Sequence, residues 1–184
     1  MTERKQRVSF RDFSTLSAED RAMGERTQVN GKPVNIFRVL MNHPKLTRAW
    51  GKFATYILSD QQTLGARERE ILILRIGWLN QAPYEFEQHV RIGKECGLTD
   101  DEIDRIGKGP KAGWNKHDAA LIQAADDLFE NSVVSDETWK TLSERYNTEQ
   151  MMDAVFTVGQ YNLVSWALNS LGVPLDDYLP GAKK

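Results

Sequence analysis

The chain has 184 residues, a formal net charge of -2 and 40% hydrophobic residues. This length suits one domain with a sizeable core, and the near-neutral charge argues against the basic footprint of a nucleic-acid-binding protein. No apolar run approaches the ~18–20 residues of a membrane span, and residues 1–11 lack the apolar stretch of a signal peptide. We therefore expect a cytoplasmic protein without nucleic-acid or membrane partners. A single cysteine, Cys96, leaves no internal disulfide and no cysteine-pair redox site, so we expect a buried or half-buried bystander.

Almost every segment has the periodicity of a helix and none shows sustained strand alternation, which predicts an all-α fold. Residues 1–34 are expected to form a polar N-terminal arm with one short helix capped by Ser17, followed by a loop over 24–32. Residues 35–184 are expected to form a single helical domain. Its predicted helices span 44–58, 66–79, 83–96, 100–106, 118–130, 136–146 and 148–171, the last capped by Thr148.

Two of these helices carry a heavy apolar load. The helix over 66–79 is apolar nearly all round, and the long helix over 148–171 could cross the whole molecule. Such helices are usually central or face another subunit, which argues against a monomer. Arg75 interrupts the first of them and needs an acidic partner or a bound anion, because burying it unpaired would be costly. The tryptophans Trp50, Trp78 and Trp166 are expected in the core.

The most informative segment is the octet of residues 82–89, Ala-Pro-Tyr-Glu-Phe-Glu-Gln-His. Pro83 indicates a helix start, which places Glu85 in the first turn and His89 one turn further on the same face. A carboxylate and an imidazole that face one cavity are the smallest set of side chains expected for general acid–base proton transfer. The alternative is a surface pair worth a few tenths of a kcal/mol.

The region around this octet resembles the carboxymuconolactone decarboxylase family, which includes the alkyl hydroperoxidase D branch. The resemblance rests on residues 64–98, with a pattern of Arg67, Arg69, Glu70, Leu72 and Arg75 before the octet and His89, Val90, Arg91, Gly97 and Leu98 after it. A looser similarity extends over residues 117–175, through the stretches 159–162 and 168–172. The family implies an all-α, alkyl hydroperoxidase D-like helical bundle.

The hydroperoxidase branch has a glutamate, a Cys-x-x-Cys pair and a histidine. The glutamate falls on Glu70 and the histidine on His89, but the two cysteine positions fall on Ala82 and Glu85. Thiol peroxidase chemistry needs one thiolate to attack and a second thiol to resolve. This chain lacks the pair, so the comparison disfavours that activity.

The decarboxylase branch has a glutamate and a histidine spaced like Glu85 and His89. It implies a trimer or hexamer with sites near the subunit interfaces, and a metal-free, cofactor-free decarboxylation of a carboxylated lactone in aromatic compound degradation. The implied roles are His89 as general acid/base, Glu85 as its orienting carboxylate or partner base, Glu70 as a relay and Tyr84 as an oxyanion donor. Glu70 could instead belong to a charged first turn, and Tyr84 could be a core aromatic.

The substrate would be a small molecule contacting Arg75, Trp78, Tyr161 and Asn162, with a carboxylate held by one of Arg67, Arg69, Arg75 and Arg91. A metal bound by Glu70, Glu85 and His89 is not expected, because no second histidine supports that set. Two alternatives stay open: a lyase, isomerase or dehydratase acting on a related oxo-acid, and a non-catalytic helical oligomer that binds a small hydrophobic acid.

Overall fold

The computed structural model describes residues 1, 4–26, 28–180 and 182. The described chain is built from helices with one short antiparallel hairpin, which confirms the all-α prediction. Thr27 of the predicted arm and the last residues of the predicted 35–184 domain lie outside this description. The elements are η1 (Phe13–Thr15), α1 (Ala18–Gly24), β1 (Gln28–Val29), β2 (Lys32–Pro33), α2 (Asn35–Leu40), α3 (Pro44–Leu58), α4 (Ala66–Leu79), α5 (Pro83–Glu95), α6 (Asp100–Lys108), α7 (Lys116–Asn131), α8 (Asp136–Ser143) and α9 (Thr148–Leu171).

The helix starts follow ordinary capping chemistry. Ser17 accepts a hydrogen bond from the backbone N–H of Asp20, as predicted, and Pro44 and Pro83 begin α3 and α5. The cap of α9 is Asn147, not Thr148: it forms a capping box with Gln150. Three predicted helices have shifted ends, with α6 ending at Lys108, α7 starting at Lys116 and α8 ending at Ser143.

Sequence patterns missed the 3-10 helix η1, helix α2 and the β1–β2 hairpin near the N-terminus. Helix α2 is only six residues long and begins at Asn35, and its N-cap residue is Val34, whose side chain cannot cap it. The predicted loop over 24–32 contains strand β1, which pairs Val29 with Lys32 of β2 around the turn residues Asn30 and Gly31. Both turn residues have positive φ, which is typical of a tight hairpin turn.

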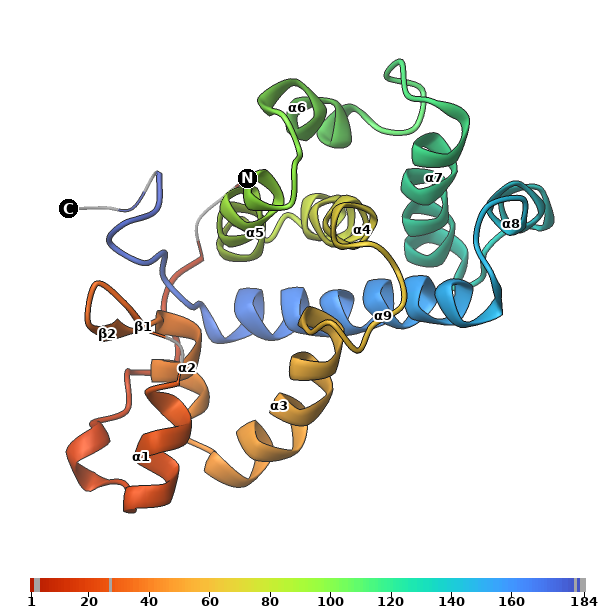
Figure 1. Cartoon of the computed structure of the whole chain (residues 1–184). Coiled ribbons are helices and arrows are strands. Elements are labelled where there is room, and N and C mark those ends of the chain that lie inside the picture. Colours follow the sequence, from red (N-terminus) through yellow and green to blue (C-terminus); the bar gives the residue numbers. More distant parts are fainter. Residues whose placement is uncertain (2–3, 27, 181, 183–184) are drawn as a thin grey trace.

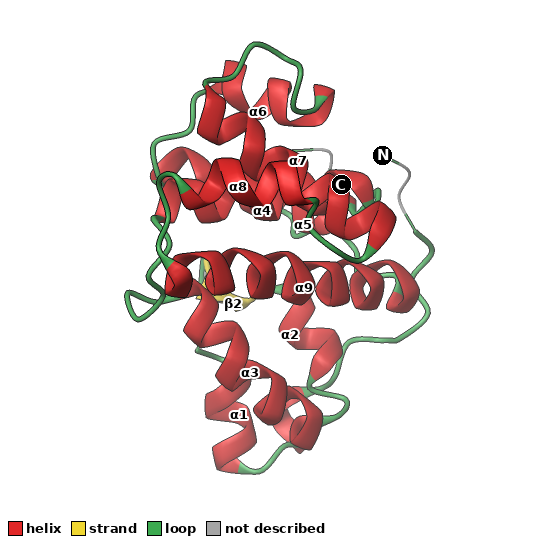
Figure 2. Cartoon of the chain, turned by 90° about the vertical axis from the view of Figure 1, so that its right-hand side faces the viewer, coloured by secondary structure: helices red, strands yellow, loops and turns green. Residues whose placement is uncertain are grey.

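Helix α4 is the centre of the fold and packs against α5, α7 and α9 (Figure 1). Its run Ile71 to Leu74 is completely buried. In Figure 2, α9 crosses the molecule between an upper group formed by α4 to α8 and a lower group formed by α1 to α3. The apolar load of α4 is thus covered within one chain and by itself requires no second subunit.

Helix α9 is different, because its outer face is open. Trp166, expected in the core, has 56% of its surface exposed. Periodicity placed it on an apolar stripe but could not show that the chain leaves this stripe uncovered.

Within the described residues, no helix combines the length and apolar character needed to cross a membrane.

Candidate acid–base site

The close packing of α4 on α5 brings the predicted acid and imidazole groups together. Helix α4 ends at Leu79 and α5 begins at Pro83, so only three residues connect them. Gly93 allows the two helices to approach closely: a Cβ there would lie 3.0 Å from Leu98 Cδ1 and 3.4 Å from Leu74 Cδ1. This packing sets Glu70 of α4 beside His89 of α5.

His89 lies between two carboxylates. Its Nδ1 is 2.6 Å from Glu70 Oε2, and its Nε2 is 3.0 Å from Glu85 Oε1. The first contact is a hydrogen bond, whereas Glu85 Oε1 lies close to the ring but is not aligned as a hydrogen-bond acceptor. All three side chains are buried, with Glu70 completely so. The i,i+4 pair predicted from the octet is therefore part of a buried cluster, not a surface salt bridge.

The charge of this cluster favours a protonated histidine. Burial alone would lower the pKa of His89, but the carboxylates of Glu70 and Glu85 outweigh it and raise this pKa to about 10. On the other side of the cluster, Arg69 Nε donates to Glu70 Oε1 at 3.3 Å. The two carboxylates are thus compensated by an imidazolium and a guanidinium, and burying the group need not leave an unpaired charge.

Three polar groups beside His89 have no hydrogen-bond partner among the described residues. They are the carboxylate oxygen Glu85 Oε1, which is fully buried, and the side-chain amide of Gln160 and the hydroxyl of Tyr161, whose polar atoms are not fully buried. The Tyr161 ring meets the imidazole edge-on, with centroids 4.8 Å apart. Gln160 and Tyr161 are only 4% and 6% exposed. Buried polar groups normally find partners, which makes Glu85 Oε1 unusual. Because Gln160 and Tyr161 line the same cleft, all three groups can form hydrogen bonds to a ligand there.

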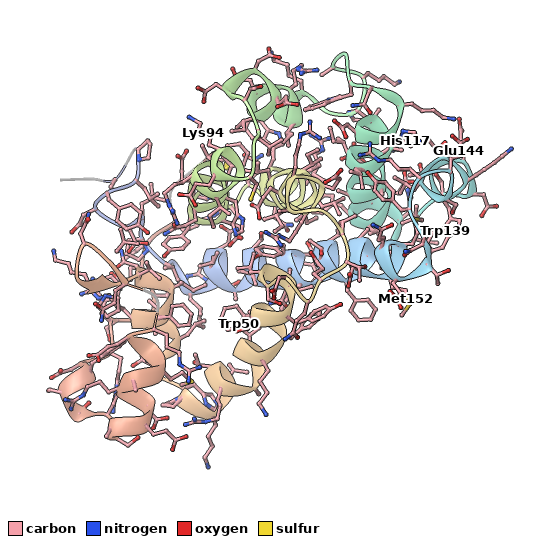
Figure 3. The ribbon with its side chains drawn as sticks, viewed as in Figure 1. Trp50, Lys94, His117, Trp139, Glu144 and Met152 are labelled. Atoms are coloured by element: carbon pink, nitrogen blue, oxygen red, sulfur yellow. The ribbon has the colours of Figure 1, made fainter. Side chains whose placement is uncertain are left out.

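These groups line a cleft of about 900 Å³ between α5 and α9 on one side and the N-terminal helices on the other. Its floor carries Glu85, His89, Gln160 and Tyr161, and its opposite wall is largely apolar, formed by Ile36, Phe37, Trp50, Ala54 and Leu58. Figure 3 shows Trp50 on α3, below α9. The site therefore joins a small polar floor to a larger apolar wall, as is usual for small-molecule sites.

Tyr84 lines the cleft, but its hydroxyl is already occupied. It donates to Asp176 Oδ2 at 2.6 Å and accepts from the backbone N–H of Ile36 at 3.1 Å. Gln88 donates to the same carboxylate oxygen at 2.7 Å. Burial, with the nearby Asp176 charge, raises the pKa of Tyr84 well above its ordinary value. This tyrosine ties the C-terminal segment and α2 to the start of α5.

Three of the predicted substrate contacts lie away from the cleft. Arg75 forms a two-pronged ion pair with Asp126 of α7 and donates to the Ile106 and Gly107 carbonyls. Trp78 packs on Phe86, with ring centroids 5.5 Å apart. Asn162 accepts a hydrogen bond from Asn80. The acidic partner that Arg75 required is Asp126, so its burial is explained without a bound anion.

Of the four arginines expected as anion anchors, Arg91 alone lines the cleft. Arg67 pairs with Glu102 and Asp118, and Arg69 pairs with Glu70. Among the described residues Arg91 pairs only with Glu95 on the same helix, where both side chains are about half exposed. Such an exposed pair is weak and can be exchanged for a ligand carboxylate.

The remaining candidates for chemistry lie elsewhere. His117 Nε2 is 3.9 Å from Glu144 Oε2. Both residues lie at the upper right of Figure 3, away from Trp50 of the cleft wall. Cys96 is half-buried, as predicted, and burial raises its pKa, so the thiol form is favoured. In the part of the chain that the structure describes, no group of three His, Cys, Asp or Glu side chains is arranged to hold a metal ion. The ring nitrogens of His89 already face carboxylates, with Nδ1 beside Glu70 and Nε2 beside Glu85.

The sequence profile of the Carboxymuconolactone decarboxylase family matches residues 44–126, which include α3, α4, α5 and the whole acid–base cluster. Residues 44–126 belong to this family. This match confirms the family resemblance that the octet and its flanking residues indicated. The chain has one cysteine and hence no Cys-x-x-Cys pair. No curated protein matches the chain.

Solved structures show the same fold. A protein from Ralstonia eutropha JMP134, described as an alkylhydroperoxidase AhpD core and an uncharacterized peroxidase-related protein, aligns with a TM-score of 0.83 at 20% identity, covering 93% of this chain and 92% of that one. An uncharacterized peroxidase-related protein from Silicibacter sp. TM1040 aligns with a TM-score of 0.82 at 14% identity, covering 99% and 98%. A putative antioxidant defence protein AhpD from Agrobacterium tumefaciens aligns with a TM-score of 0.68 at 16% identity, covering 74% and 94%. At these identities the likeness establishes the AhpD-like helical fold and nothing about activity.

Proposed function

We propose that this protein is a cofactor-free lyase that moves a proton through His89 while it acts on a small carboxylated molecule. The favoured case is decarboxylation of a carboxylated lactone or a related oxo-acid. The observation that carries the proposal is the imidazole of His89, held between Glu70 and Glu85 on the floor of a cleft. A buried histidine with two carboxylate neighbours is suited to hold and deliver a proton.

In this reaction the carbon–carbon bond that joins the carboxylate to the rest of the substrate breaks. Carbon dioxide leaves, and the electron pair of that bond passes into an extended enolate. The enolate carbon then takes a proton from the His89 imidazolium. A carbanionic carbon is a much stronger base than imidazole, so the transfer is favourable even with the pKa of His89 at about 10. Water returns the proton to the ring afterwards.

The surrounding residues have distinct roles in the proposal. Glu70 holds the Nδ1 proton, which leaves Nε2 as the side of the ring that exchanges a proton near Glu85. Gln160 and Tyr161 offer hydrogen bonds to the oxygen on which the enolate charge develops. Arg91 at the cleft wall holds the substrate carboxylate. The role of oxyanion donor, first expected of Tyr84, passes to Tyr161, because the Tyr84 hydroxyl is bound to Asp176.

A thiol-dependent peroxidase is not proposed, although two of the similar structures are described as peroxidase-related. The sequence has one cysteine, Cys96, so no second thiol is present in the chain to resolve an oxidised first one.

A substrate screen tests the proposal. The purified protein is incubated with carboxylated five-membered lactones and 2-oxo acids, and carbon dioxide release and loss of absorbance are followed. His89→Gln should lower turnover by several powers of ten, whereas His117→Gln, which changes a histidine outside the cleft, should not. Equal rates for His89→Gln and the wild type would remove the imidazole from the mechanism. Tight binding of these acids without turnover would instead favour the non-catalytic binder.

A further inference from the structure

The outer face of α9 carries an uncharged stripe that the described chain covers only in part: the Phe156 ring packs edge-on against Phe53 of α3, with centroids 6.1 Å apart. The exposed positions of the stripe are Met152, Phe156, Gly159, Leu163, Trp166 and Ser170. The four large side chains among them are each 52–56% exposed. No charged residue occurs anywhere between Ala154 and Leu175. In Figure 3, Met152 projects from the start of α9 away from the overlying helices.

The spacing of these positions is that of a coiled-coil seam. The intervals along the helix are four, three, four, three and four residues, which is the alternation of a and d positions in a heptad repeat. A helix on the surface of one chain needs no such seam on its solvent side, where charged residues are the rule. This pattern therefore indicates a second helix as the partner.

We propose that the stripe on α9 packs antiparallel against the same stripe of a second copy of this chain. Around a two-fold axis that passes between Gly159 and Leu163 on the stripe, Gly159 meets the partner's Leu163, and Phe156 meets the partner's Trp166. Large residues then lie opposite a small or an aromatic one at each layer. A two-fold interface requires such self-complementarity, because both copies present the same patch.

The stripe supplies about half of the surface that such a partner would cover. A large side chain offers roughly 200 Å², so four that are about half exposed leave on the order of 400 Å² of apolar surface. An apolar patch of this area is about as large as the largest patch that a monomeric protein usually exposes. It is also about half of the ~800 Å² per partner that a stable interface buries. Leu46 of α3, which is 54% exposed and borders the same pocket as Leu163, extends the apolar surface on one side.

The stripe lies on the opposite side of α9 from Tyr161, whereas Gln160, one turn from Phe156, lies between the two faces. No residue of the stripe lines the cleft. The proposed interface is therefore separate from the acid–base site, and its fate does not depend on the proposed reaction.

Sedimentation equilibrium of the full chain tests the interface. The wild type should show an even multiple of the 21.0 kDa chain mass. Leu163→Asp should halve that mass with an unchanged circular dichroism spectrum, while Val133→Asp, at an exposed apolar position outside the stripe, should leave it unchanged. A monomeric or odd-numbered wild type, or an assembly that Leu163→Asp does not alter, would overturn the proposal. Binding of the monomeric protein to lipid vesicles through the stripe would also overturn the proposal.

Cross-linking tests the antiparallel register without a destabilising charge. Gly159→Cys and Leu163→Cys are each made with Cys96→Ser. Mixed together under mild oxidation, they should form a disulfide between unlike chains, and each alone should form far less. A parallel arrangement would produce the reverse, with like positions linked, and would contradict the two-fold geometry.

Discussion

The imidazole Nδ1 of His89 lies 2.6 Å from Oε2 of Glu70, although the two residues are 19 positions apart and belong to different helices. This contact turns a simple i,i+4 pair on α5 into a three-residue buried cluster. It also determines which ring nitrogen can exchange a proton with a substrate. Nδ1 is hydrogen-bonded to Glu70, so Nε2, which faces Glu85, is the nitrogen that exchanges it. The first two predictions follow from this arrangement.

Proton retention by His89 is measurable directly. With its pKa raised to about 10 by Glu70 and Glu85, against the burial that opposes them, the ring should stay protonated at neutral pH. Nuclear magnetic resonance of protein labelled with ¹⁵N-histidine should show an imidazolium at pH 8. Glu70→Gln should lower this pKa by more than one unit. A neutral His89 ring in the wild type at pH 7 would contradict the charge assignment.

The same shift predicts how stability depends on pH. The pKa of His89 in the folded chain lies above its ordinary value of 6.5, so the stabilisation is complete below pH 6.5 and is lost as the pH rises through about 10. Between pH 7 and 9 the free energy of unfolding should fall by about 1 kcal/mol per pH unit relative to His89→Gln. Urea unfolding at several pH values measures it. The window ends at pH 9 because Tyr84 and Tyr161 have an ordinary pKa of 10.0 in the unfolded chain. Parallel pH profiles for the two proteins would contradict the prediction.

The sequence predicted most of the fold because its signals are local. Pro44, Pro83 and the capping box of Thr99 with Glu102 mark helix starts by chemistry contained within a few residues. The pairing of Glu85 with His89 is local in the same sense. The contacts that the sequence could not assign depend on which helices meet: the Asp126 partner of Arg75, the Asp176 partner of Tyr84 and the covered or open face of each helix. Gln160 is a polar residue within the apolar helix α9, but nothing local in the sequence indicates that it lines the cleft.

Tyr84 should prove a structural residue. Tyr84→Phe removes the hydrogen bond to Asp176 and leaves a carboxylate, held also by Gln88 and the Asn35 N–H, with one donor fewer. We expect a loss of about 1–3 kcal/mol in the free energy of unfolding, measured by urea denaturation, and little change in turnover under folded conditions. Asp176→Asn should destabilise the protein to a similar degree. A large loss of turnover in Tyr84→Phe with unchanged stability would restore the catalytic role expected from the sequence.

Gln160 and Tyr161 should show the opposite behaviour. Their polar groups have no hydrogen-bond partner among the described residues, so Gln160→Leu and Tyr161→Phe remove no internal hydrogen bond and should leave the free energy of unfolding within about 1 kcal/mol of the wild type, or raise it. If these groups bond the developing enolate oxygen, each variant should lose roughly tenfold to a thousandfold in kcat with a smaller change in KM, because the contact strengthens in the transition state. Asn162→Leu is the matched control, since Asn162 is adjacent in sequence but bonded to Asn80, away from the cleft. It should lose stability through that broken hydrogen bond while keeping its turnover. Should Gln160→Leu and Tyr161→Phe unfold more easily and turn over substrate at the wild-type rate, the two residues would be packing elements, and the cleft floor would need another donor.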